Sequence, residues 1–147
     1  MDGAVLVGDD GRVVACGPAA AVPHPDGVPA EDLGDGVLLP GLVNAHTHLE
    51  LTVLRGLVRV RPFSDWVHAV RGIKDGLDAA DFLASSCSGA LECLASGITT
   101  VGDTGSTLTP ARAMAELGLR GTAYHEVFGP DPAQVQPSLD GADTALT

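Results

Sequence analysis

Apolar segments with the lengths of strands alternate with helical segments over most of the chain, and this alternation restricts the fold more than any other feature. The expected elements from residue 42 onward are a strand leading to His46, a helix over 78–97, a strand over 98–103, a helix over 109–118 and a strand over 119–128. Such alternation predicts parallel strands joined by right-handed crossovers, which is an α/β fold. A shorter helix capped by Ser64 and Asp65 is expected to run to Lys74, and the last fifteen residues have the pattern of a further helix.

The helix over 78–97 has the clearest one-sided pattern in the chain. Its apolar positions recur with the 3.6-residue period of a helix, and they are Leu83, Cys87, Ala90, Leu91 and Leu94. We expect Asp78 to start this helix and Gly97 to end it in the left-handed conformation.

The first 39 residues contain shorter elements. Two apolar segments, 4–7 and 12–16, flank the sequence GDDG, whose residues tolerate left-handed backbone angles, so a β-hairpin is expected. Residues 19–31 are rich in proline and have little periodicity, which favours a surface loop. A further strand is expected over 36–39, before the Pro-Gly pair that precedes the strand leading to His46.

Two histidines, His46 and His48, end that strand. Residues two apart on a strand point to the same side, so both imidazoles are expected on one side of the sheet. Two neutral imidazoles placed in this way can bind one divalent cation, for which histidine is the commonest ligand. The alternative is two unrelated histidines in a solvated turn, but the apolar segment before them and their place at a strand end favour the metal.

Polar residues also end the next two expected strands, with Asp103 on the second and Glu126 on the third. Each could be an ordinary cap or turn residue. In parallel α/β folds, however, ligands bind at the carboxyl ends of the strands. Three strands that all end in groups able to bind a metal or a proton therefore predict a shared site.

Charge and hydropathy exclude several classes of partner. The formal net charge is −11, which argues against nucleic acid, because phosphate binding depends on Lys and Arg. No apolar segment approaches the length needed to cross a membrane and no signal peptide opens the sequence, so a cytoplasmic protein is expected. Five of the eight basic residues lie close together in the sequence: Arg55, Arg59, Arg61, Arg71 and Lys74. They form either a solvated face or a site for an anionic substrate group.

Several motifs together resemble the amidohydrolase superfamily of metal-dependent hydrolases. The most specific is LPGLVNAHTHL at 39–49, with LRG at 54–56 and DWV at 65–67 downstream. The segment GITTVGD at 97–103 is similar to the second barrel strand of the family, and GRVVACG at 11–17 to a hairpin of its small β-sandwich domain. Within the superfamily, the chain most resembles the cytosine deaminase, chlorohydrolase and aminofutalosine deaminase-like branch.

The resemblance implies an α/β fold that is the first three strands of a (β/α)₈ barrel, preceded by part of a β-sandwich. It places the partial sandwich at 1–39 and the amino-terminal part of the barrel at 40–147. His46 and His48 match two ligands of one divalent metal ion, zinc or iron, while the other ligands and the catalytic groups are expected on later strands. His125 lies on the third strand, where the family places no ligand, and is expected to be an ordinary strand histidine.

The implied reaction is hydrolysis of a non-peptide C–N bond, namely deamination of a small heterocyclic amine by a metal-activated water. Glu50, Asp103 and Glu126 are candidates for contacts with that substrate, and Trp66 could line its pocket, although a core position is commoner for such a tryptophan. Homo-oligomers are possible for the full-length protein. The alternatives are a non-catalytic truncated fragment that lacks the remaining metal ligands, or a chlorohydrolase-type enzyme acting on C–Cl bonds.

Overall fold

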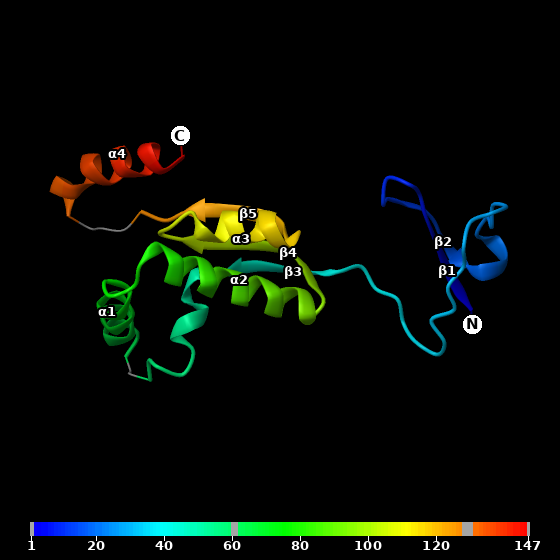
Figure 1. The fold of residues 1–147 in the computed structure, drawn as a ribbon, viewed down its shortest axis with the longest axis horizontal. Coiled ribbons are helices and arrows are strands. Elements are labelled where there is room, and N and C mark those ends of the chain that lie inside the picture. Colours follow the sequence, from blue (N-terminus) through cyan, green and yellow to red (C-terminus); the bar gives the residue numbers. More distant parts are fainter. Residues whose placement is uncertain (1, 60–61, 128–130, 147) are drawn as a thin grey trace. The chain divides into compact units, whose positions relative to one another are not determined.

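A three-stranded parallel sheet is the centre of the larger of two compact units in the chain. The computed structural model describes residues 2–59, 62–127 and 131–146, and the units are Met1–Leu38 and Leu39–Thr147. The sheet consists of β3 (Leu42–Thr47), β4 (Ile98–Gly105) and β5 (Arg120–His125) in that order (Figure 1). All pairs are parallel, which confirms the predicted α/β class.

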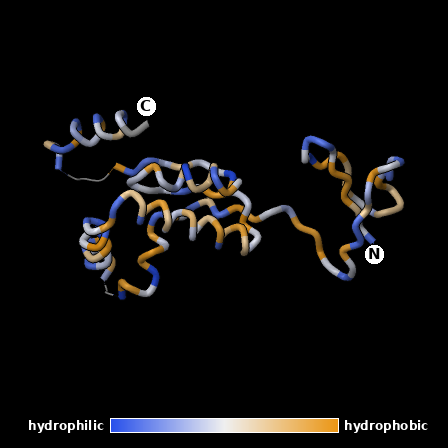
Figure 2. Tube along the Cα trace, viewed as in Figure 1, coloured by the Kyte–Doolittle hydropathy of each residue, from blue (hydrophilic) through white to orange (hydrophobic). Residues whose placement is uncertain are grey.

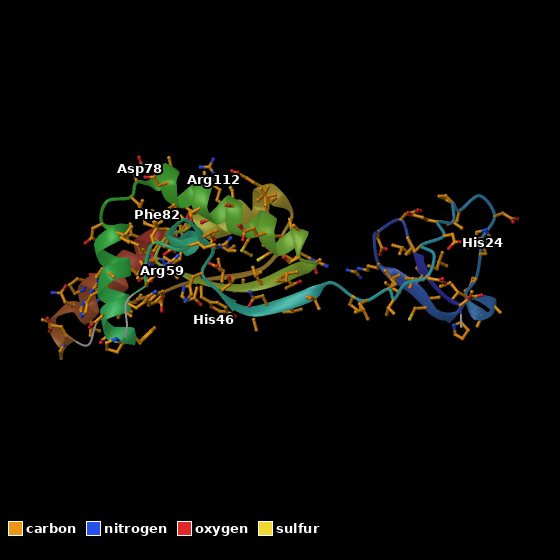
Figure 3. The ribbon with its side chains drawn as sticks, turned by 90° about the horizontal axis from the view of Figure 1, so that it is seen from below. His24, His46, Arg59, Asp78, Phe82 and Arg112 are labelled. Carbon is orange, nitrogen blue, oxygen red and sulfur yellow. The ribbon has the colours of Figure 1, made fainter. Side chains whose placement is uncertain are left out.

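Two helices cover one face of this sheet. They are α2 (Ala79–Ala95) and α3 (Thr109–Leu117), which pack against each other and contact β4 and β5 (Figure 3). The turn of 3-10 helix η2 (Leu49–Leu54) follows β3 directly and packs on α2. The helix α3 begins at Thr109, the predicted first residue, after an N-cap at Leu108, and Gly118 is its C-cap with a φ of 73°.

The buried side of α2 differs from the predicted apolar stripe. Its buried residues are mostly small ones: Phe82, Ser85, Ser86, Gly89, Ala90 and Cys93. Leu91, expected in the stripe, is 53% exposed. Close approach explains the difference, because a Cβ atom on Gly89 would lie 2.4 Å from Thr52 Oγ1 of η2. Small side chains, and not the largest apolar ones, therefore let η2 lie against this helix.

A capping box fixes the start of α2. The Asp78 carboxylate accepts hydrogen bonds from the backbone N–H groups of Ala80 and Asp81, and the Asp81 carboxylate accepts one from Asp78 N–H. Each of these donors would otherwise lack a partner within the helix. The predicted start at Asp78 is confirmed.

Removing this cap is expected to lower stability measurably. Asp78→Ala should reduce the free energy of unfolding by about 1 kcal/mol, the typical cost of losing an Asp N-cap. Urea-induced unfolding followed by circular dichroism measures the difference. Asp26→Ala, in an exposed turn, is the control and should behave as the unaltered chain does. Equal stability of the two variants would contradict the role of the cap.

The remaining helices are α1 (Phe63–Lys74), η3 (Pro132–Gln134) and α4 (Val135–Leu146). The predicted end of α1 at Lys74 is correct, but its N-cap is Pro62 and no side chain caps it. Ser64 and Asp65 were expected to cap it, and they lie inside its first turn instead, because the helix begins earlier. Among the described helices, none is long and apolar enough to cross a membrane.

The smaller unit contains the predicted hairpin, formed by β1 (Gly3–Val7) and β2 (Val13–Pro18). A short 3-10 turn, η1 (Ala19–Ala21), follows it. The strand predicted over 36–39 is wrong, since these residues have no regular secondary structure. They are hydrophobic (Figure 2) but exposed, 85% in the case of Val37, and no strand among the described residues pairs with them. Without a neighbour to satisfy its backbone, such a segment cannot form a strand.

Candidate functional site

The two histidines lie at the carboxyl end of β3. Their ring centroids are 4.9 Å apart and the ring planes are nearly perpendicular, at 86°. His46 is exposed and lies on the side of the sheet opposite α2 and Phe82 (Figure 3). His48 follows the last strand residue and is half-buried. A close contact fixes the start of this strand, because a Cβ on Gly41 would lie 2.2 Å from Thr99 Oγ1.

Asp103 lies on β4, paired in register with Thr47 between the two histidines. It is fully buried, and its Oδ1 accepts a hydrogen bond of 2.7 Å from the backbone N–H of Leu49. Its other oxygen, Oδ2, is buried and has no hydrogen-bond partner among the described residues. Burial raises the pKa of this carboxyl group, and the Leu49 hydrogen bond and the nearby histidines only partly oppose the effect.

These groups fit part of a cation site. Imidazole nitrogens suit zinc and iron, and a buried carboxylate oxygen without a donor would gain from a nearby positive charge. Within the described ranges, no group of three or more His, Cys, Asp or Glu side chains could hold a metal ion. Since a catalytic zinc site typically has three protein ligands, His46 and His48 would supply two of them.

Glu50, two residues after His48, is only 1% exposed. Its carboxylate accepts a hydrogen bond of 2.5 Å from Lys74 Nζ and others of 2.6–3.1 Å from the backbone N–H and hydroxyl groups of Ser106 and Thr107. Burial alone would raise the pKa of Glu50, but these donors outweigh it and leave the pKa below its ordinary value. The hydrogen-bond donors and the positive charge of Lys74 therefore stabilise the ionised form of the Glu50 carboxyl group.

Ser106 and Thr107 belong to no motif that marks them as functional in the sequence, and Lys74 belongs to the local cluster of basic residues. Of the cluster members that the structure describes, two form ion pairs, Lys74 with Glu50 and Arg55 with Glu92. Arg61 lies outside the described residues. No local signal in the sequence could reveal the hydrogen bonds between Ser106 and Glu50, because the two residues are 56 positions apart.

The other residues named from the sequence are Glu126, His125 and Trp66. Glu126 directly follows β5 and is half-buried, and its backbone N–H donates to Gly105 O at 2.7 Å. His125 Nδ1 is buried without a partner among the described residues. Trp66 stacks on Phe63 with ring centroids 5.6 Å apart and lines a cavity of about 250 Å³ between η2 and α1.

Comparison with known proteins shows what this arrangement is similar to. The sequence model of the amidohydrolase family matches residues 37–131, more than half of the chain. A 5-methylthioadenosine/S-adenosylhomocysteine deaminase from Nitratidesulfovibrio vulgaris (strain Hildenborough) is 36% identical over 143 residues, which cover 92% of this chain and 31% of the relative. A deaminase of the same name from Symbiobacterium thermophilum is 32% identical over 99% of this chain and 34% of its own length.

Among solved structures, a triazine hydrolase from Arthobacter aurescens aligns with a TM-score of 0.55 and 28% identity, over 65% of this chain and 25% of that one. The chain thus spans about a third of the length of the curated relatives that it matches. The chain therefore belongs to the amidohydrolase family.

Proposed function

We propose that the protein carrying this chain is a metal-dependent hydrolase that deaminates a small heterocyclic amine. The observation that carries the proposal is the pair of adjacent imidazoles at the carboxyl end of the first parallel strand. Membership of the amidohydrolase family and the deaminase names of the relatives support it. Those names also favour an adenine-bearing thioether nucleoside as the substrate.

The proposal includes the fold around the site. The parallel order β3-β4-β5 supports the first three strands of a (β/α)₈ barrel, with 40–147 as its amino-terminal part and 1–39 as part of a small β-sandwich domain. The relatives are about three times as long as the matched region, so the remaining ligands and the proton-transfer groups are expected outside residues 1–147.

Each residue of this chain has a limited part in the reaction. His46 and His48 would hold one divalent ion, zinc or iron, which when bound supplies a water of lowered pKa. The net reaction is hydrolysis, in which one water is consumed, the ring amino group is replaced by oxygen and ammonia is released. Glu126, at the end of β5, is a candidate to orient the substrate.

The test uses the product of the complete reading frame that encodes this chain, called here the full-length protein. Its zinc and iron content is measured, and the metal-loaded protein is assayed for ammonia release from 5-methylthioadenosine, S-adenosylhomocysteine, cytosine and an aminotriazine. We expect about one metal per protein and release from an adenine nucleoside first. Failure to release ammonia from any of them would overturn the proposal. Chloride release from a chlorotriazine alone would identify a C–Cl hydrolase instead.

A further inference from the structure

The backbone immediately after His48 is held by two buried carboxylates. Leu49 N–H donates to Asp103 of β4, and the side chain of Glu50 accepts from Ser106 and Thr107 in the loop that follows β4. Two consecutive residues after the second histidine are therefore attached to the neighbouring strand and its loop. We call Asp103 and Glu50 the carboxylate clamp.

We propose that the carboxylate clamp positions the histidine pair for metal binding, and that neither Asp103 nor Glu50 contacts the substrate. This inference rests on the proposed metal site. Both side chains are almost completely buried. Both Glu50 oxygens and Asp103 Oδ1 already accept hydrogen bonds from the chain itself. A substrate would have to displace these donors to reach those three oxygens, at the cost of leaving buried polar groups unpaired. Asp103 Oδ2 has no donor among the described residues, but it is buried and so out of reach of a substrate in solution.

The loop after β4 is shaped to approach Glu50. A Cβ atom on Gly105 would lie 3.0 Å from Glu50 Oε2 and 3.1 Å from its Cδ, closer than ordinary contacts. The backbone can therefore bring the N–H groups of Ser106 and Thr107 onto the carboxylate. Glycine at this position and four donors from two adjacent residues indicate that the loop and Glu50 form one rigid unit.

Lys74 has a different part in the same network. It supplies the positive charge that compensates Glu50, and it also donates to Ser106 Oγ at 2.7 Å. It lies at the end of α1, far in sequence from His48. Without Lys74, the hydrogen bonds from Ser106 and Thr107 to Glu50 would remain. A positioning role for Glu50 therefore predicts that Glu50 and Lys74 variants differ in metal affinity although both lose stability.

The experiment measures the affinity of the full-length protein for Zn²⁺ by competition with a chromophoric chelator. Asp103→Ala and Glu50→Gln should each weaken binding roughly 10- to 100-fold, the usual effect of removing groups that orient metal ligands. In Glu50→Gln, an amide NH₂ replaces one acceptor oxygen and faces N–H donors. Lys74→Met is the matched control and should bind Zn²⁺ as the unaltered protein does.

Asp103→Asn separates the clamp from a simple effect of charge. The amide oxygen can still accept from Leu49 N–H, so Asp103→Asn loses the negative charge near the ion but keeps the clamp, and it should weaken Zn²⁺ binding less than Asp103→Ala does. The inference is overturned if Asp103→Asn weakens Zn²⁺ binding as much as Asp103→Ala. Loss in Lys74→Met equal to that in Glu50→Gln would also overturn it. If the unaltered protein binds no Zn²⁺, the proposed function itself fails.

Discussion

Replacing His46 or His48 with alanine is expected to remove the divalent metal from the full-length protein and to abolish ammonia release. Structural zinc sites with four ligands bind with about 10–16 kcal/mol, so one ligand accounts for about 3 kcal/mol, or roughly 100-fold in affinity. The pair would lose its bidentate character with either change, because the two rings are only 4.9 Å apart and act together. Elemental analysis after dialysis and an ammonia assay with saturating substrate measure the two effects.

The controls are His24→Ala and His68→Ala, whose side chains are exposed and are not adjacent to the pair in sequence. Both should retain metal and turnover. Circular dichroism of His46→Ala should match that of the unaltered protein, since His46 is exposed and contributes no core packing. Metal and turnover that persist in both site variants would refute the assignment of these histidines.

The order of the elements in the larger unit was predictable because their signals are local. Strand and helix periods, the Asp78 cap and Gly118 each depend on a few neighbouring residues, and all were placed close to where the structure has them. The buried side of α2 was not predictable in the same way. Hydrophobicity favours leucines, whereas the fit against η2 requires Gly89, and only the tertiary structure reveals that requirement. The strand predicted over 36–39 failed for a related reason, since pairing depends on a partner elsewhere in the chain.

In the candidate site, too, local features could be predicted from the sequence and long-range contacts could not. The His46 and His48 pair was visible because residues two apart on a strand come together. The environment of Glu50 was not, because its partners come from α1 and from the loop after β4. A sequence shows that an acidic residue follows the histidines, but it does not show whether solvent, substrate or a lysine faces it. In the folded chain, long-range hydrogen bonds place a lysine and two hydroxyl-bearing residues against it.

Glu50→Ala is expected to cause the largest loss of stability of any single change in the ion pairs. Removing one partner of a buried pair typically costs about 3–5 kcal/mol, and here the donors of Ser106 and Thr107 also lose their acceptor. Glu92→Ala is the matched control, because Arg55 and Glu92 approach equally closely, at 2.5 Å, but are exposed. That variant should change stability little. Unfolding of the full-length protein in urea, followed by circular dichroism, compares them.

The change of the free energy of unfolding with pH tests the role of Glu50 in a second way. The pKa of Glu50 in the folded protein lies below its ordinary value of 4.5, so the stabilisation it provides is complete above about pH 4.5 and is lost as the pH falls through the folded value. Asp103 acts in the opposite sense, because its raised pKa means that acid relieves the cost of its buried charge. Glu50→Gln removes the first contribution and reduces the second only slightly, because the Glu50 charge is a minor cause of the raised Asp103 pKa. The variant should therefore lose less stability on acidification. Parallel stability curves below pH 4.5 would show that the charged Glu50 carboxylate does not stabilise the fold.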